Sequence, residues 1–274
     1  MSAAPQLRAI FRLQLFAIGS WVVVASGLPA VLTPFPRRWR KTAPFIQRWA
    51  KLGAYCLGLK VDLEGRLPTP GSLVVANHQG YVDIVALGSL FPCIFVARHD
   101  MRGWPLFGQL AASGATIFLN RENKRAGFRG VGLVREALAV GATVIAFPEG
   151  TSTDGTGLLP FRTGVFQAAI DAGAPVVPVG IRYLSLDGKP LDAEAHKLVG
   201  WFQGEPFLRH LLRLGGHRQV KVGIKFGAPL LSPREDRRQL AARAEEAVFG
   251  LLGIPPGTRP IINGRRRKEA RASA

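Results

Sequence analysis

A histidine and an aspartate closely follow one apolar run of the sequence, in SLVVANHQGYVDIVALGSL at residues 72–90. His78 comes directly after Asn77, and Asp83 follows the short QGY stretch. On one continuous helix the two side chains would diverge, because five positions rotate about 140° past a full turn. If residues 72–77 form a strand and a helix begins near Asp83, the carboxylate can accept the Nδ1 proton of His78. Nε2 is then free to act as a general base.

The place of this pair at a strand end favours a functional site, because ligands bind at the carboxyl ends of strands in open α/β sheets. The same spacing also occurs often by chance, and a histidine in a loop is commonly a surface residue. The pair alone therefore leaves catalysis and a structural role both open.

Three further blocks accompany other apolar runs. GATIFLNR ends on Arg121, whose guanidinium could grip a phosphate or a carboxylate on a substrate. FPEGTSTDG closes a strand predicted at residues 143–147, and VVPVGI forms another apolar strand that contains Pro178. The ordered set is far more specific than any single block.

With these blocks in this order, residues 70–185 resemble the lysophosphatidate acyltransferase family, the glycerolipid acyltransferases. The residues that carry the resemblance are Asn77, His78 and Asp83 in the first block, Gly114, Phe118 and Arg121 in the second, Phe147–Thr151 in the third and Val177–Ile181 in the fourth.

The resemblance implies an enzyme that moves a fatty acyl chain from acyl-CoA or acyl-carrier protein to a lysolipid hydroxyl, with no cofactor and no metal. His78 would remove the hydroxyl proton, and Asp83 would orient His78 and stabilise the imidazolium. A thioester is already activated, so no nucleophilic serine is needed, and the sequence has no Gly-x-Ser-x-Gly elbow. The residues that the resemblance assigns to acceptor binding are Arg121, Glu149, Gly150, Thr151 and Arg162.

The third block departs from the family at Ser152, where the family commonly has an arginine associated with the acceptor phosphate. The expected acceptor is 1-acyl-sn-glycerol-3-phosphate, which would give phosphatidic acid. The alternative is lyso-ornithine lipid, because FPEGTSTDG followed by LLPFR resembles the branch of the family that acylates this zwitterionic lipid. Asp154 is expected to be a turn residue.

Charge and hydropathy point to an anionic membrane surface as a partner. The chain has 36 Lys plus Arg against 18 Asp plus Glu, a net charge of +18, together with a positive mean hydropathy of +0.15. A strongly basic chain suits a polyanion, and the hydropathy favours a membrane over nucleic acid. A non-catalytic basic membrane-binding protein, or a nucleic-acid binder, is the remote alternative. The two cysteines, Cys56 and Cys93, offer neither a disulfide framework nor a metal-ligand spacing.

The uncharged segment at residues 13–33 predicts a membrane-embedded helix, either spanning or re-entrant. A cleaved signal peptide is the alternative, since VVASG offers small residues. The heavier positive flank follows the segment and should stay in the cytoplasm. We therefore expect the protein on the cytoplasmic face of the inner membrane. That flank comprises Arg37, Arg38, Arg40, Lys41 and Arg48.

The rest of the chain alternates short apolar runs with helical patterns, which predicts an α/β fold with a mostly parallel central sheet flanked by helices. We expect a membrane anchor at residues 1–42, an acyltransferase domain at 43–258 and a basic tail at 259–274. Strands are predicted at residues 72–77, 93–98, 115–120, 143–148, 176–183 and 219–227. Helices are predicted at residues 42–59, 83–91, 105–112, 127–140, 162–172 and 233–252.

Overall fold

The computed structural model describes residues 3–34, 36–103, 107–120, 123–202, 204–231 and 236–260. In chain order the elements are α1 (Ala3–Val31), α2 (Arg38–Leu57), β1 (Leu59–Glu64), β2 (Leu73–Ala76), α3 (Tyr81–Leu90), β3 (Ile94–Arg98), a 3-10 turn η1 (His99–Gly103), α4 (Phe107–Ser113), β4 (Ile117–Leu119), α5 (Lys124–Ala139), β5 (Val144–Ala146), α6 (Gly164–Ala172), β6 (Val176–Leu186), β7 (Lys189–Pro190), α7 (Ala193–Val199), α8 (Phe207–Gly215), β8 (Val220–Phe226) and α9 (Arg237–Leu252).

The strands form one mostly parallel sheet with the order β1-β8-β6-β2-β5-β3-β4, and β7 pairs with β6 outside this path. β2 lies between β6 and β5 and is parallel to both. β8 is antiparallel to β6, and β1 is parallel to β8, so these two strands run against the rest. The predicted α/β class with a mostly parallel sheet is confirmed.

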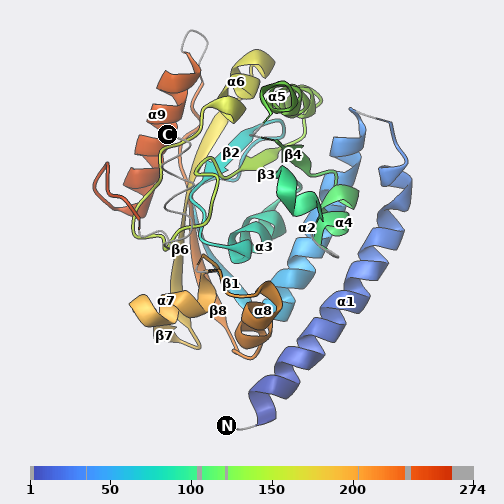
Figure 1. Ribbon diagram of the computed structural model, residues 1–274, viewed down its shortest axis with the longest axis vertical. Helices are drawn as coiled ribbons and strands as arrows, with labels where there is room; N and C mark the ends of the chain where they lie inside the picture. The colour runs from blue at the N-terminus through green and yellow to red at the C-terminus, as the bar shows by residue number, and fades with distance from the viewer. Residues whose placement is uncertain are drawn as a thin grey trace.

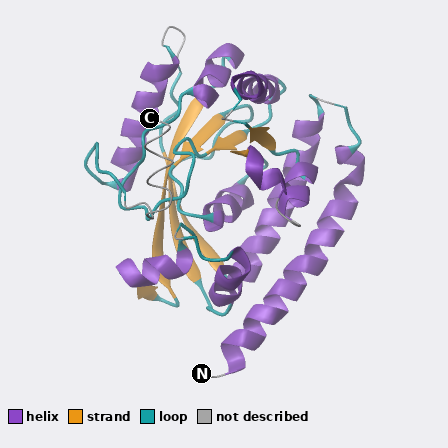
Figure 2. Cartoon of the chain, viewed as in Figure 1, coloured by secondary structure: helices purple, strands orange, loops and turns teal. Residues whose placement is uncertain are grey.

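Helices cover both faces of the sheet (Figure 1). On one face α3 lies under α2, and α1 lies outside α2; on the other face α9 packs on β6, and α6 contacts both α5 and α9. Figure 2 shows the sheet between these helical layers. β2 and β5 are therefore buried on both sides, which explains their continuous apolar sequences.

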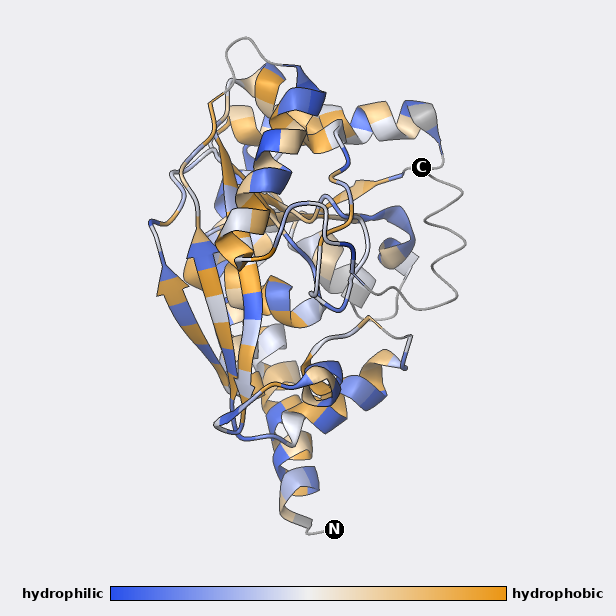
Figure 3. Cartoon of the chain, turned by 90° about the vertical axis from the view of Figure 1, so that its left-hand side faces the viewer, coloured by the Kyte–Doolittle hydropathy of each residue, from blue (hydrophilic) through white to orange (hydrophobic). Residues whose placement is uncertain are grey.

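Toward the β1 edge the strands alternate instead. β8 follows a nearly strict buried-exposed pattern, and hydrophobic and hydrophilic residues alternate along the strands in Figure 3. This two-residue period is typical of a sheet with one solvated face. The sheet thus changes from a fully buried centre, at β2 and β5, to a half-solvated margin.

The N-terminal helix begins earlier than the uncharged segment, at Ala3 rather than near residue 13. By length and composition α1 could cross a membrane, and little of its apolar stretch is buried in the molecule. Arg8 and Arg12 from its first turns donate to main-chain carbonyls at the end of α8 and just beyond, including Gly216 O at 2.8 Å and His217 O at 2.5 Å. Both arginines thus supply donors to the orphan carbonyls of another helix.

The second helix passes through the expected boundary between residues 42 and 43, because α2 is continuous from Arg38 to Leu57. Trp49 on α2 donates its indole N–H to Ser20 Oγ on α1 at 3.1 Å and packs against Phe16. The two helices therefore form one unit with the sheet. Most of the basic tail, residues 261–274, lies outside the described residues.

Candidate active site

β2 delivers the first block to the centre of the molecule. Asn77 follows the strand, is buried, and pairs with the main chain of Ile181 on β6 in both directions: its Nδ2 donates to Ile181 O at 3.0 Å, and its Oδ1 accepts from Ile181 N at 2.8 Å. The asparagine side chain thereby continues the β2–β6 pairing for one further residue. His78 then leaves the sheet at a fixed point.

The predicted pairing of His78 with Asp83 is present in the structure. His78 Nδ1 lies 2.9 Å from Asp83 Oδ2, and the histidine ring is 19% exposed while the carboxylate is fully buried. An ionised carboxylate only accepts hydrogen bonds, so the proton of a neutral His78 is placed on Nδ1. Nε2 is then the acceptor, as a general base requires.

Asp83 sits in the first turn of α3, where backbone N–H groups lack partners within the helix. Its Oδ2 accepts from Gln79 N at 2.6 Å and Gly80 N at 3.0 Å, in addition to His78. Its Oδ1 accepts from the hydroxyl of Tyr183 at 2.6 Å. Four donors offset the cost of burying this charge and fix the orientation of the carboxylate.

The third block holds His78 from the other side. Phe147 stacks on the imidazole with ring centroids 4.1 Å apart. Glu149 Oε1 accepts from His78 N at 2.8 Å, while Thr153 N donates to His78 O at 2.8 Å. The histidine is therefore fixed at both main-chain groups and on one ring face, and its remaining freedom is small.

Glu149 is a buried clamp between two loops. Its second oxygen, Oε2, accepts from Leu159 N at 2.9 Å, so the carboxylate joins the His78 loop to the segment after the third block. Burial raises the pKa of Glu149 to about 8, and the two N–H donors act in the opposite direction. Gly150 follows with a φ of +76°, a left-handed conformation that favours glycine at this turn.

A main-chain segment around Trp201 crosses both loops. Trp201 N donates to Gln79 O at 2.9 Å, and Trp201 O accepts from the hydroxyl of Ser152 at 2.9 Å. A Cβ on Gly80 would lie 2.8 Å from Trp201 N, so only glycine admits this approach. Ser152, where the family commonly has arginine, is itself buried. The short side chain of Ser152 lets the Trp201 segment pass close to this turn.

The other predicted acceptor-binding residues differ in placement. Arg162 is exposed, and its main-chain N–H donates to Pro148 O at 3.0 Å. Its Cα therefore lies beside the turn that contains Glu149. Thr151 is half-buried in that turn. Arg121 lies outside the described residues. Asp154 accepts from the N–H and the hydroxyl of Thr156, as expected of a turn residue.

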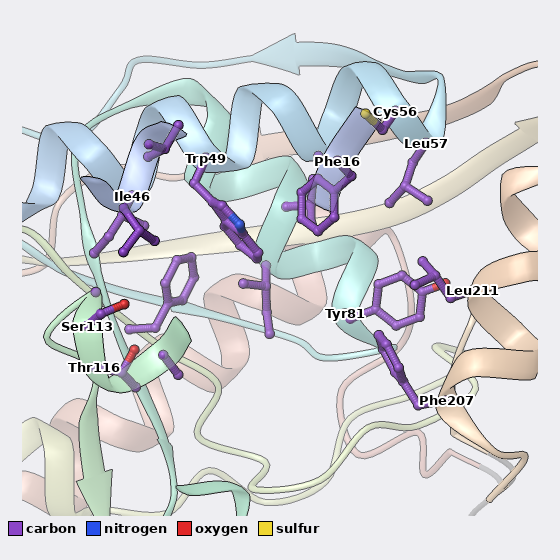
Figure 4. A pocket seen from close by; sticks show the side chains of 18 of the residues that line it. Phe16, Ile46, Trp49, Cys56, Leu57, Tyr81, Ser113, Thr116, Phe207 and Leu211 are labelled. Carbon is purple, nitrogen blue, oxygen red and sulfur yellow. The ribbon is translucent and has the colours of Figure 1, made fainter. Parts of the chain in front are cut away.

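An apolar groove with a cavity volume of about 240 Å³ runs along the face of α3 that is turned to α2. Its walls come from α1, α2, α3, α8 and the β3–β4 region, and we call it the apolar groove throughout. Figure 4 shows Tyr81, Phe207 and Leu211 at one end and Ser113 and Thr116 at the other. Among its lining residues are Phe16, Ile46, Trp49, Ile84, Val85, Ala111, Thr116, Trp201 and Leu211.

One end of the groove lies next to the histidine loop, although His78 and Asp83 are not among its lining residues. Tyr81 and Trp201 line it, and Trp201 is bonded to Gln79, the neighbour of His78. Thr116 precedes β4, which is separated from β2 by β5 and β3 in the sheet order. The described residues hold no cluster of three or more His, Cys, Asp or Glu side chains suited to a metal ion.

Sequence reasoning identified the pair and the third block but not the contacts made through side chains far away in sequence. Phe147 and Asn77 were part of quoted blocks, without a role. Tyr183 was only the end of a predicted strand. In the structure it is buried between exposed Arg182 and Leu184, but the apolar Leu184 hides this alternation in the sequence.

Comparison with known proteins finds acyltransferases. Residues 59–182 match the family described as Acyltransferase. The chain is 36% identical to the lyso-ornithine lipid O-acyltransferase of Pseudomonas aeruginosa over 92% of this chain and 95% of that protein. It is 32% identical to the enzyme of the same name from Rhizobium meliloti, over 87% and 80%. It is also 32% identical to the 1-acyl-sn-glycerol-3-phosphate acyltransferase of Neisseria gonorrhoeae, over 73% and 77%.

The fold has a solved counterpart in the 1-acyl-sn-glycerophosphate acyltransferase PlsC from Thermotoga maritima, with a TM-score of 0.62 at 22% identity, covering 90% of this chain and 96% of that one. The fold and the relatives point to the same class of protein. The chain belongs to the acyltransferase family.

Proposed function

We propose that the protein is a membrane-bound O-acyltransferase that moves a fatty acyl chain from a thioester, acyl-CoA or acyl-carrier protein, to the hydroxyl of a lysolipid. The observation that carries the proposal is the fixed His78–Asp83 pair in the loop that leads to Tyr81, which lines one end of the apolar groove. An oriented, partly exposed base can accept the proton of the lysolipid hydroxyl. The neighbouring apolar groove can hold the alkyl chain of the donor.

The chemistry follows from the tautomer of His78. Nε2 accepts the proton of the lysolipid hydroxyl as the oxygen attacks the thioester carbonyl. Asp83 stabilises the imidazolium that results, because its buried charge lies 2.9 Å from Nδ1. The tetrahedral intermediate expels the thiolate, which takes the proton from the imidazolium. The products are an ester and a free thiol, and His78 returns to its starting state.

We assign the apolar groove to the acyl chain of the donor. A chain laid from Tyr81 toward Thr116 would place its thioester end near the histidine loop and its methyl end at the sheet margin. Each buried methylene contributes about 0.8 kcal/mol, so the groove can hold the chain without directional contacts.

We place α1 in one leaflet of the cytoplasmic face of the inner membrane, parallel to its surface rather than across it. Arg8 and Arg12 tie its first turns to the end of α8, and Ser20 is tied to α2. Its outward face is apolar, as a membrane-inserted surface requires. The basic residues nearby would contact anionic head groups. The exposed apolar side chains are Leu7, Ile10, Phe11, Ile18, Trp21, Val22 and Leu28 on α1 and Leu32 just beyond its end.

We propose lyso-ornithine lipid as the favoured acceptor. Ser152 takes the place of the family's phosphate-associated arginine, and its hydroxyl is used to hold Trp201 across the site. Two relatives of that name also match 87% and 92% of the chain. Lysophosphatidate is the second candidate, because Arg162 beside the Glu149 turn could pair with a phosphate and a relative is named for this substrate.

An acceptor panel tests the assignment, with purified full-length protein, one radiolabelled acyl donor and either lyso-ornithine lipid or lysophosphatidate. We expect faster acylation of lyso-ornithine lipid. Ser152→Arg should reduce that activity, because the larger side chain displaces the Trp201 segment. Arg162→Ala should raise the KM for lysophosphatidate about ten- to a hundredfold, because one charge-assisted hydrogen bond to the phosphate is lost.

Arg129→Ala is the matched control, since this exposed arginine lies on α5. Efficient acylation of lysophosphatidate by the wild-type protein, with lyso-ornithine lipid ignored, would reverse the order of the two acceptors. Equal KM values for the Arg162→Ala and Arg129→Ala variants would remove Arg162 from the acceptor site.

A further inference from the structure

Tyr183 reaches the catalytic pair from a strand that carries none of its members. β6 continues beyond the end of β2, whose last residue Ala76 is in register with Val179. Tyr183 therefore lies at the level of the turn between β2 and α3. Its hydroxyl donates to Asp83 Oδ1 at 2.6 Å, and the ring is buried.

The two carboxylate oxygens of Asp83 accept different numbers of hydrogen bonds. Oδ2 accepts from His78 Nδ1, Gln79 N and Gly80 N. Among the described residues, Tyr183 supplies the donor to Oδ1. Without that hydroxyl, one end of a fully buried carboxylate would lack this partner, and rotation about the carboxyl axis would be less restrained.

Tyr183 is itself held in place. Its ring stacks on His196 with centroids 5.4 Å apart, and His196 Nε2 lies 2.7 Å from Gln79 Oε1. Gln79 Nε2 donates to Ile181 O at 2.8 Å, so Gln79 Oε1 is the acceptor and His196 Nε2 carries the proton. Burial, and then the charge of Asp83, raise the pKa of Tyr183 well above its usual value, so the phenol keeps its proton and remains a donor.

We propose that Tyr183 is a positioning residue for acyl transfer: its hydroxyl fixes Asp83 Oδ1 so that Oδ2 stays directed at His78 Nδ1. This inference rests on the proposed role of His78 as the general base. Tyr183 is buried behind Asp83, so the proposal predicts an effect on kcat rather than on KM. A tyrosine that only filled the core would affect stability and leave turnover per folded molecule unchanged.

The test is Tyr183→Phe in the full-length enzyme, which removes only the hydroxyl. We expect kcat per folded molecule to fall about tenfold, with KM for donor and acceptor within twofold of wild type. Tyr55→Phe is the matched control, because this ring on α2 is 72% exposed and lies outside the site. An unchanged kcat in Tyr183→Phe would overturn the proposal.

A double-mutant cycle with Asp83→Asn separates positioning from packing. If Tyr183 acts through Asp83, adding Tyr183→Phe to Asp83→Asn causes no further loss of kcat, whereas a full additional tenfold loss contradicts the proposal. Should Tyr183→Phe fail to fold, 3,5-difluorotyrosine at position 183 keeps the ring and acidifies the hydroxyl. The stronger donor withdraws negative charge from the Asp83 carboxylate and so weakens its stabilisation of the His78 imidazolium, which lowers kcat severalfold. Insensitivity to fluorination contradicts the inference.

His78→Ala, measured in parallel, distinguishes failure of the proposed general-base mechanism from failure of the proposed role of Tyr183. Near-normal turnover in His78→Ala would defeat the general-base mechanism itself. Loss of turnover in His78→Ala together with an unaffected Tyr183→Phe would defeat only the role of Tyr183.

Discussion

The two halves of the proposed site are built by opposite means. Around His78 nearly every polar atom has a named partner, supplied by β2, α3, β6 and the third block. The apolar groove is defined by the side-chain shapes of five or more elements. The hydrogen-bonded half fixes one geometry, while the groove accepts any chain that fits its length and width. Changes in the first half should therefore act on rate, and changes in the second on substrate choice.

The largest effect is expected from the hydrogen-bonded half. His78→Ala should reduce kcat about 10²- to 10⁴-fold, the usual contribution of a positioned general base. Asp83→Asn should also be severe, because an amide can donate to Nδ1 and so favour the wrong tautomer. Radiolabelled acyl transfer by folded protein measures both, and His99→Ala, on the exposed η1 turn, is the matched histidine control. Near-normal turnover in His78→Ala would show that the hydrogen-bonded half does not set the rate of acyl transfer.

Removing residues 1–36 tests the groove and the membrane contact together. α1 supplies one wall, so a long acyl chain would lose apolar contact along several methylenes. At about 0.8 kcal/mol each, three or four of them correspond to roughly a hundredfold in kcat/KM for a long-chain donor. Membrane attachment should weaken without disappearing, since nearby basic residues contribute about 1 kcal/mol each at an anionic surface.

Two phenylalanines on α1 separate these roles. Phe16 lines the groove and Phe11 is 65% exposed on the outward face. Phe16→Ser should lower kcat/KM for long chains with little effect on vesicle binding, and Phe11→Ser should do the reverse. A truncated protein that is fully soluble at low salt would show that the basic surface makes no membrane contact.

The smallest effect is a change in preferred chain length. Thr116→Phe places a larger side chain at the groove end remote from the histidine loop (Figure 4). Each excluded methylene costs about 0.8 kcal/mol, or about fourfold in relative kcat/KM, so the optimum should move to shorter donors while kcat for a short donor is preserved. A series of acyl-CoA lengths measures this, with Leu133→Phe on α5 as control. An unchanged length optimum would show that the chain does not reach Thr116.

The sequence was informative where local signals decide the structure. β2 and β5 were predicted from unbroken apolar runs, and the predicted His78–Asp83 pairing depends on one short turn. α2 was predicted from its helical periodicity. These features depend on residues within about one element of each other, so pattern and spacing are sufficient.

The rest depends on partners far along the chain. β1 (Leu59–Glu64) was missed because LKVDLE is mostly exposed and, within the described part of the chain, pairs with β8 alone, near residue 220. α7 and α8 were missed as well, and with them the Trp201 segment that crosses the site. Tyr183 could be assigned to a strand, but its bond to Asp83 links positions 100 residues apart, and no local pattern encodes it.

The clamp formed by Arg8 and Arg12 has a consequence for biosynthesis. The carbonyl that Arg8 binds belongs to Gly216, 208 residues later in the chain. At about 5–20 residues per second, roughly 10–40 s separate the emergence of these two residues from the ribosome. For that interval α1 has an apolar surface and no α8 to bind, so it meets the membrane or a chaperone first. The order of synthesis thus leaves α1 available to a bilayer or a chaperone before the carbonyls that its arginines bind have been made.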